Sequence, residues 1–151
     1  MNSLLCIELC AGCARLSATL YARGFKVMAI DQKQNRQKQL HATIALDLAS
    51  DEAVQYLKSL LRQPGVVLFL HCAPPCGTAS RARERKLSWR LRAAGVREPK
   101  PLRSGLHPEG LPHLRSTDLK RVQTANAIYR NICILLRAAH EVGALISVEN
   151  P

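Results

Sequence analysis

A cysteine on a proline-stiffened loop is the residue of this sequence whose setting best suits chemistry. Cys76 lies within the stretch HCAPPCGTAS and directly follows two consecutive prolines. Two prolines in a row exclude both a helix and an inner strand, so the loop holds the thiol rigidly. A cysteine that only packs in a core needs no such loop, whereas a nucleophilic thiolate must be held accessible. Cys76 is therefore the first candidate for a catalytic group.

The other cysteines have more ordinary settings. Cys6 and Cys133 stand among apolar neighbours and are expected in the core, and Cys72 is expected to be structural. The first residues contain no recognisable secretory signal, which argues against a disulfide framework. We therefore expect a reducing, intracellular location, nuclear or cytoplasmic.

A metal site is a weaker interpretation of the same cysteines. Cys10 and Cys13 form a Cys-x-x-Cys pair, and a zinc ion would need Cys72 and Cys76 as its further ligands. That spacing is unlike a zinc finger or a zinc ribbon, so we expect no metal.

The charge of the chain predicts a polyanionic partner. Its 151 residues include 22 Lys and Arg against 11 Asp and Glu, a net charge of +11. Residues 81–103 hold nine basic side chains against two acidic ones, which favours a nucleic-acid footprint over a uniformly solvated surface. Alternatives are a solubilising surface or a piece of a larger protein with an acidic remainder. The expected phosphate-binding residues are Arg81, Arg83, Arg85 and Lys86. Trp89 suits either stacking on a base or, more commonly, packing in the fold.

Apolar runs alternate between strand and helix patterns along the chain. Strands are expected over 4–9, 25–30, 43–46, 66–70 and 144–148, and helices over 14–23, 32–41, 50–62 and 117–142, with a short one near 87–94. This alternation predicts one α/β domain over residues 1–151, with a Rossmann-like, doubly wound and mainly parallel sheet. A basic loop is expected over 77–116, and no run is long enough to span a membrane.

The polar or reactive residues of the chain recur where the expected strands end. Ligands bind beyond the carboxyl ends of the strands in such sheets, so these residues are candidates for one site. They are Glu8 and Gly12 after the first strand, Asp31 after the second, Asp47 after the third, Cys76 after the fourth and Glu149 after the fifth.

A nucleoside-containing cofactor suits the first two strand ends. The small residues of Cys10-Ala11-Gly12-Cys13-Ala14 allow the backbone to approach a ligand, and Asp31 can bind both hydroxyls of a ribose. The loop lacks the G-x-G-x-x-G pattern, which argues against a dinucleotide. The alternative for Asp31 is a plain turn residue at the end of a strand.

Three motifs together resemble the DNA cytosine-5 methyltransferases. They are the segment from Glu8 to Ser17, ELCAGCARLS, with Gly24-Phe25 after the helix; Ala73-Pro74-Pro75-Cys76 with Ser80; and Val148-Glu149-Asn150. Asp47 matches the acidic residue after the third strand of that family. The resemblance covers nearly the whole chain, but only the first half to two-thirds of the family's catalytic domain.

The resemblance implies a class I methyltransferase fold that uses S-adenosyl-L-methionine. Cys76 would be the nucleophile that adds to C6 of cytosine, and Glu149 would hydrogen-bond the ring near N3. The resemblance also implies the cofactor contacts, which are Glu8, Ala11 and Gly12 at the methionine part, Asp31 at the ribose and Asp47 at the adenine amino group. The partner would be nucleic acid, with DNA favoured and RNA left open as the alternative.

The chain departs from the family pattern after these motifs. Gly77 follows Cys76 where the family commonly has Gln, and the arginine motif, the target-recognition region and the last strands are absent. We therefore expect a sheet that is incomplete at its carboxyl end, in a piece of a longer protein. Two alternatives stay open: a non-catalytic, basic nucleic-acid-binding module, and a methyltransferase on another target in which Cys76 only lines the pocket.

Overall fold

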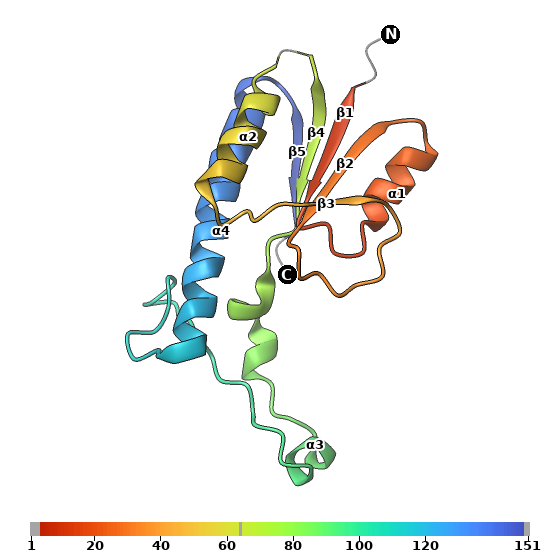
Figure 1. Ribbon diagram of the computed structural model, residues 1–151. Coiled ribbons are helices and arrows are strands. Elements are labelled where there is room, and N and C mark those ends of the chain that lie inside the picture. The colour runs from red at the N-terminus through yellow and green to blue at the C-terminus, as the bar shows by residue number, and fades with distance from the viewer. Residues whose placement is uncertain (1–3, 64, 150–151) are drawn as a thin grey trace. The chain divides into compact units, whose positions relative to one another are not determined.

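The computed structural model describes residues 4–63 and 65–149, which form two compact units (Figure 1). The first unit contains the described residues up to Pro74 and those from Ala127 to Glu149. The second contains Pro75–Asn126, and the whole of the expected basic loop over 77–116 lies in it.

A five-stranded, all-parallel sheet forms the centre of the first unit. Its order is β3-β2-β1-β4-β5, which confirms the predicted Rossmann-like α/β fold. The strands are β1 (Leu5–Leu9), β2 (Lys26–Asp31), β3 (Thr43–Ala45), β4 (Val67–Cys72) and β5 (Leu145–Val148).

Helices cover both faces of this sheet. The helix α1 (Arg15–Ala22) lies on one side, and α2 (Asp51–Leu61) lies on the other with the carboxyl-terminal part of α4 (Ser116–Glu141) (Figure 1). The main core lies beneath α2 and α4, where Ile7 and Leu70 of the sheet meet Leu57 and Leu135 of the helices. Each such side chain stabilises the fold by about 1.5–3 kcal/mol through burial.

The start of α2 and the end of α1 lie where their sequence signals predict. Ser50 caps α2 by accepting a hydrogen bond from the N–H of Ala53 at 3.2 Å, and two acidic residues follow in the first turn. Gly24 follows α1 with a φ of 87°, which only glycine adopts at little cost.

Two expectations were wrong. Residues 32–42 form turns and bends rather than a helix, because Asn35 bonds the neighbouring loop and the segment has no apolar stripe to bury. Cys133 is exposed on α4 rather than buried, whereas Cys6 and Cys72 are in the core as expected.

Hydrogen bonds from one arginine connect separate segments of the second unit. Arg103 donates to the hydroxyl oxygen Oγ1 of Thr78 (3.0 Å from Nη2), to the carbonyl of Pro108 (2.5 Å) and to Oδ1 of Asn126 (2.7 Å). Apolar support comes from Leu102 and Val122, both about 2% exposed. The unit also contains three short helices, η1 (Cys76–Thr78), η2 (Arg81–Glu84) and α3 (Trp89–Ala93).

None of the helices built from the described residues has the length and apolar character that a membrane crossing requires.

Candidate functional site

The loop after β1 is unusually tight. Cys10, Gly12 and Ala14 have φ values of 57°, 55° and 55°, so alternate residues of the loop adopt the left-handed conformation. This conformation costs a non-glycine residue about 1–2 kcal/mol, so the rest of the unit must stabilise the loop. Strain of this kind concentrates at functional sites.

The Asp31 carboxylate lies directly beside this loop. Its Oδ2 accepts a hydrogen bond from the N–H of Gly12 at 2.6 Å, and its Oδ1 accepts one from the N–H of Gln32 at 2.6 Å. The small-residue loop and the acidic residue that ends β2 are therefore adjacent, which is the arrangement that a ribose-binding site needs.

Glu8 is buried and holds α1 against the sheet. Its Oε2 accepts hydrogen bonds from both the N–H (2.8 Å) and the hydroxyl (2.6 Å) of Ser17. Bonds to a charged group stabilise by about 1.5–3 kcal/mol each, so Glu8 fixes the helix that follows the loop. Ser17 was not singled out in the sequence, because a serine inside a helix carries no local signal of such a partner.

The Asn35 side chain hydrogen-bonds both the Gly12 loop and the Asp31 carboxylate. Its amide nitrogen Nδ2 donates to the carbonyl of Gly12 at 2.6 Å and to Oδ2 of Asp31 at 3.1 Å. The Gln37 side chain also lies close, since a Cβ built on Gly12 would be 3.3 Å from its Oε1. We call residues 32–42 the strap. A ligand that binds at Oδ2 of Asp31 competes with the Asn35 amide.

The third and fifth strand ends carry exposed carboxylates. Oδ1 of Asp47 accepts a hydrogen bond from the N–H of Ala49 at 2.9 Å, which closes the turn before α2. Glu149 is exposed, and its backbone N–H donates to the carbonyl of Cys72 at 2.9 Å, beside the end of β4. Asn150 lies outside the described residues.

Cys76 lies in the second unit, at the start of η1. Its thiol is free and exposed, and its carbonyl accepts hydrogen bonds from the N–H groups of Ala79 (2.9 Å) and Ser80 (2.8 Å). The Ser80 hydroxyl in turn accepts from the N–H of Ala82 and caps η2. The sequence-based expectation of an accessible thiol on an ordered turn is therefore confirmed.

The expected phosphate-binding residues differ in their surroundings. Arg81, Arg85 and Lys86 are exposed. Arg83 instead donates to the carbonyls of Lys100 (2.9 Å) and Gly77 (3.1 Å) and so braces the loop that carries Cys76.

Burial distinguishes Cys72 and Cys10 from Cys76. It raises the pKa of Cys72 to about 12, with smaller contributions from Cys10 and Cys133. Burial and then the charge of Asp31 raise the pKa of Cys10 to about 12 as well. Both side chains remain thiols at neutral pH and are poor nucleophiles. Within residues 4–63 and 65–149, no group of three or more His, Cys, Asp or Glu side chains is arranged to hold a metal ion.

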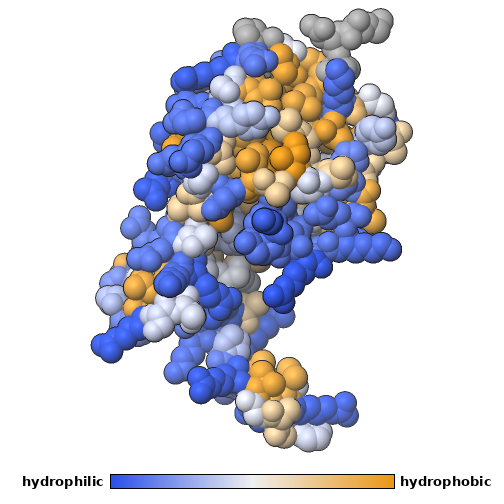
Figure 2. Space-filling view, in the orientation of Figure 1, coloured by the Kyte–Doolittle hydropathy of each residue, from blue (hydrophilic) through white to orange (hydrophobic). Residues whose placement is uncertain are grey.

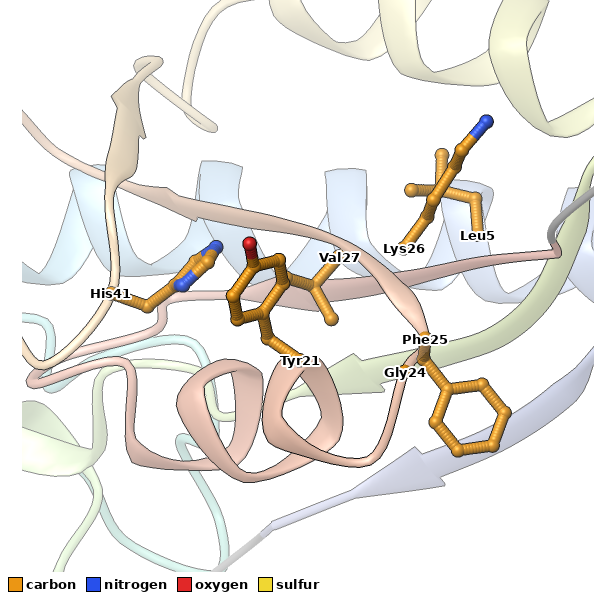
Figure 3. A pocket seen from close by; sticks show the side chains of 7 residues that line it. All are labelled: Leu5, Tyr21, Gly24, Phe25, Lys26, Val27 and His41. Carbon is orange, nitrogen blue, oxygen red and sulfur yellow. The ribbon is translucent and has the colours of Figure 1, made fainter.

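An open pocket of about 520 Å³ lies at the other end of the strands. Its walls include Leu5 and Lys26, from the first residues of β1 and β2, and the Tyr21 and His41 rings, whose centroids are 5.1 Å apart (Figure 3). Ligands of such sheets bind beyond the carboxyl ends, so we place the candidate site at the Gly12 loop rather than in this pocket.

No family model, curated protein or solved structure matches the chain.

Proposed function

We propose that the chain is an S-adenosyl-L-methionine-dependent methyltransferase domain that acts on C5 of cytosine in DNA, with RNA as the alternative substrate. The main support is the placement of the three motifs. The tight Gly12 loop lies against Asp31 beyond the parallel strands, Cys76 follows β4, and Glu149 follows β5.

The residues around the Gly12 loop fit the cofactor. Ala11 and Gly12 offer backbone without bulky side chains, and the Asp31 carboxylate accepts hydrogen bonds from ribose hydroxyls once Asn35 withdraws. Asp47 takes the adenine amino group, while Glu8 acts indirectly by holding α1 behind the loop. The cofactor, when bound, supplies the methyl group.

Cys76 and Glu149 act on the cytosine ring in this proposal. The Cys76 thiolate adds to C6, and the electron pair that moves to C5 makes that carbon nucleophilic enough to accept a methyl group. Glu149 stabilises the adduct by hydrogen bonding near N3. Water then takes the C5 proton, the electron pair of that C–H bond re-forms the C5–C6 double bond, and the C6–S bond breaks to release the Cys76 thiolate. The base must be unpaired or flipped out of a duplex to react.

A 5-fluorocytosine oligonucleotide tests the proposal. Fluorine at C5 cannot leave as a proton, so elimination stops and the covalent adduct persists on a denaturing gel. We expect the adduct with the wild-type chain and S-adenosyl-L-methionine, and its loss in Cys76→Ser. Cys133→Ser is the matched control, because Cys133 is the other exposed cysteine. No adduct with the wild-type chain, or an adduct that persists in Cys76→Ser, contradicts the assignment.

A non-catalytic nucleic-acid-binding module is the second candidate. The exposed Arg81, Arg85 and Lys86 favour it, because phosphate binding needs no reactive thiol. This candidate predicts oligonucleotide binding that weakens as salt rises, with no adduct. Methyl transfer that survives Cys76→Ser would instead indicate another target.

A further inference from the structure

The only tryptophan of the chain is exposed at the first residue of α3. Trp89 has 70% of its surface accessible, although burial of a tryptophan is normally among the larger contributions to a core. Packing, the more common role expected from the sequence, is therefore wrong. Figure 2 shows a group of hydrophobic residues at α3 with hydrophilic residues around it.

An arginine lies over the indole ring. The guanidinium carbon of Arg90 is 5.6 Å from the ring centroid, within the range of a cation–π contact. This contact places a positive charge over the indole, most of whose surface stays accessible. An accessible aromatic ring with an adjacent guanidinium matches the combination with which proteins hold the face of a base and the phosphate next to it.

Positive charge continues along the segment around α3. The exposed basic side chains there are Arg81, Arg85, Lys86, Arg92, Arg97 and Lys100. Oε1 of Glu98 is 4.0 Å from Nε of Arg92. Both side chains are about half exposed, so water screens the attraction between them and the ion pair is weak. The surface favours a polyanion over an apolar or cationic protein partner.

Two internal anchors hold the ends of this segment in place. Arg83 ties η2 to the carbonyl of Lys100, and Arg103 ties the chain after α3 to Thr78. These hydrogen bonds join the two ends of the segment over 83–100, and α3 lies between them, at the tip of the segment. A stacking residue on a closed segment loses less freedom on binding than one on an unanchored loop.

We infer that Trp89, with Arg90 beside it, is a stacking platform for an unpaired base of the nucleic-acid substrate. This inference rests on the nucleic-acid substrate of the proposed function. Bases inside a duplex are covered on both faces by their neighbours, so an exposed indole selects single-stranded over double-stranded nucleic acid. The neighbouring cations bind phosphates without regard to sequence.

Tryptophan fluorescence reports directly on stacking between Trp89 and a base, because the chain has no other tryptophan. The Cys76→Ser variant is titrated with a single-stranded oligonucleotide and with the same sequence as a duplex, at two salt concentrations. We expect quenching by the single strand, weaker quenching by the duplex, and lower affinity at higher salt. Saturation without quenching would overturn the inference.

Substitution of the ring gives a second, independent measurement. By the anisotropy of a labelled single strand, Trp89→Ala is expected to bind about 5- to 150-fold more weakly, and Trp89→Phe to keep most of the affinity. Leu91→Ala is the matched control, because Leu91 is also apolar and exposed on α3 and is expected to matter little. Equal affinities of wild type and Trp89→Ala would overturn the inference. The exposed residues of α3 would then be candidates for contact with a protein instead. The covalent adduct is measured separately, so its failure is distinguishable from failure of stacking.

Discussion

At the scale of single residues, the structure sorts the cysteines by chemistry. Cys76 is exposed on an ordered turn, whereas Cys10 and Cys72 are desolvated and have a pKa of about 12. Burial keeps the latter two protonated at neutral pH, so they are poor nucleophiles there. The exposed cysteines, Cys76 and Cys133, are the ones that a substrate can reach.

The raised pKa values predict how stability depends on pH. An unfolded cysteine ionises near pH 8.5, whereas Cys10 and Cys72 stay protonated in the fold until about pH 12. Below pH 8 both states hold these protons and stability is unaffected. Between pH 9 and 11 only the unfolded state releases them, so the free energy of unfolding falls by up to about 1.4 kcal/mol per pH unit for each thiol.

Urea unfolding at pH 8, 9 and 10 measures this slope. Cys72→Ala removes one of the thiols whose pKa burial raises and is expected to flatten the slope. A slope that is identical in wild type and Cys72→Ala contradicts the assignment.

At the scale of elements, the strap over 32–42 is the feature that sequence patterns failed to predict. The expected helix there rested on composition, whereas the observed path depends on Asn35 reaching Gly12, 23 residues away. The hydrogen bonds from Ser17 to Glu8 and from Arg103 to Thr78 also join residues far apart in the sequence. Strands such as β4 were predictable because a short apolar run needs no distant partner to be recognised.

Removal of the Asn35 amide is expected to strengthen cofactor binding. Asn35→Ala deletes the two bonds that hold the strap to Gly12 and Asp31, so a ligand no longer competes with them. We expect the affinity for S-adenosylhomocysteine, the unreactive product, to rise about 3- to 30-fold, as one or two hydrogen bonds imply. Isothermal titration calorimetry measures this change.

Gln34→Ala is the matched control for the strap. Gln34 is an exposed residue of the same segment and makes none of the bonds to the loop. Its variant is expected to bind like the wild type. Weaker binding by Asn35→Ala would mean that the amide contacts the ligand instead of blocking it.

At the scale of the whole molecule, the residues of the proposed site come from both units. The first holds the small-residue loop and Asp31 at the edge of its sheet, and the second holds Cys76 and the basic segment. The parallel order of the sheet followed from the alternation of strands and helices. The division into two units did not, because it depends on contacts within 75–126, such as those of Arg103, that the sequence does not reveal.

Calorimetric binding of S-adenosyl-L-methionine tests the central claim most directly. We predict one site per chain, and a tenfold or greater loss of affinity in Asp31→Asn, which keeps an oxygen for the Gly12 N–H but loses the charge that attracts the ribose hydroxyls. Glu52→Gln, at an exposed carboxylate of the first unit, is expected to bind normally. No heat of binding with the wild-type chain, or equal affinity in Asp31→Asn, would contradict the claim.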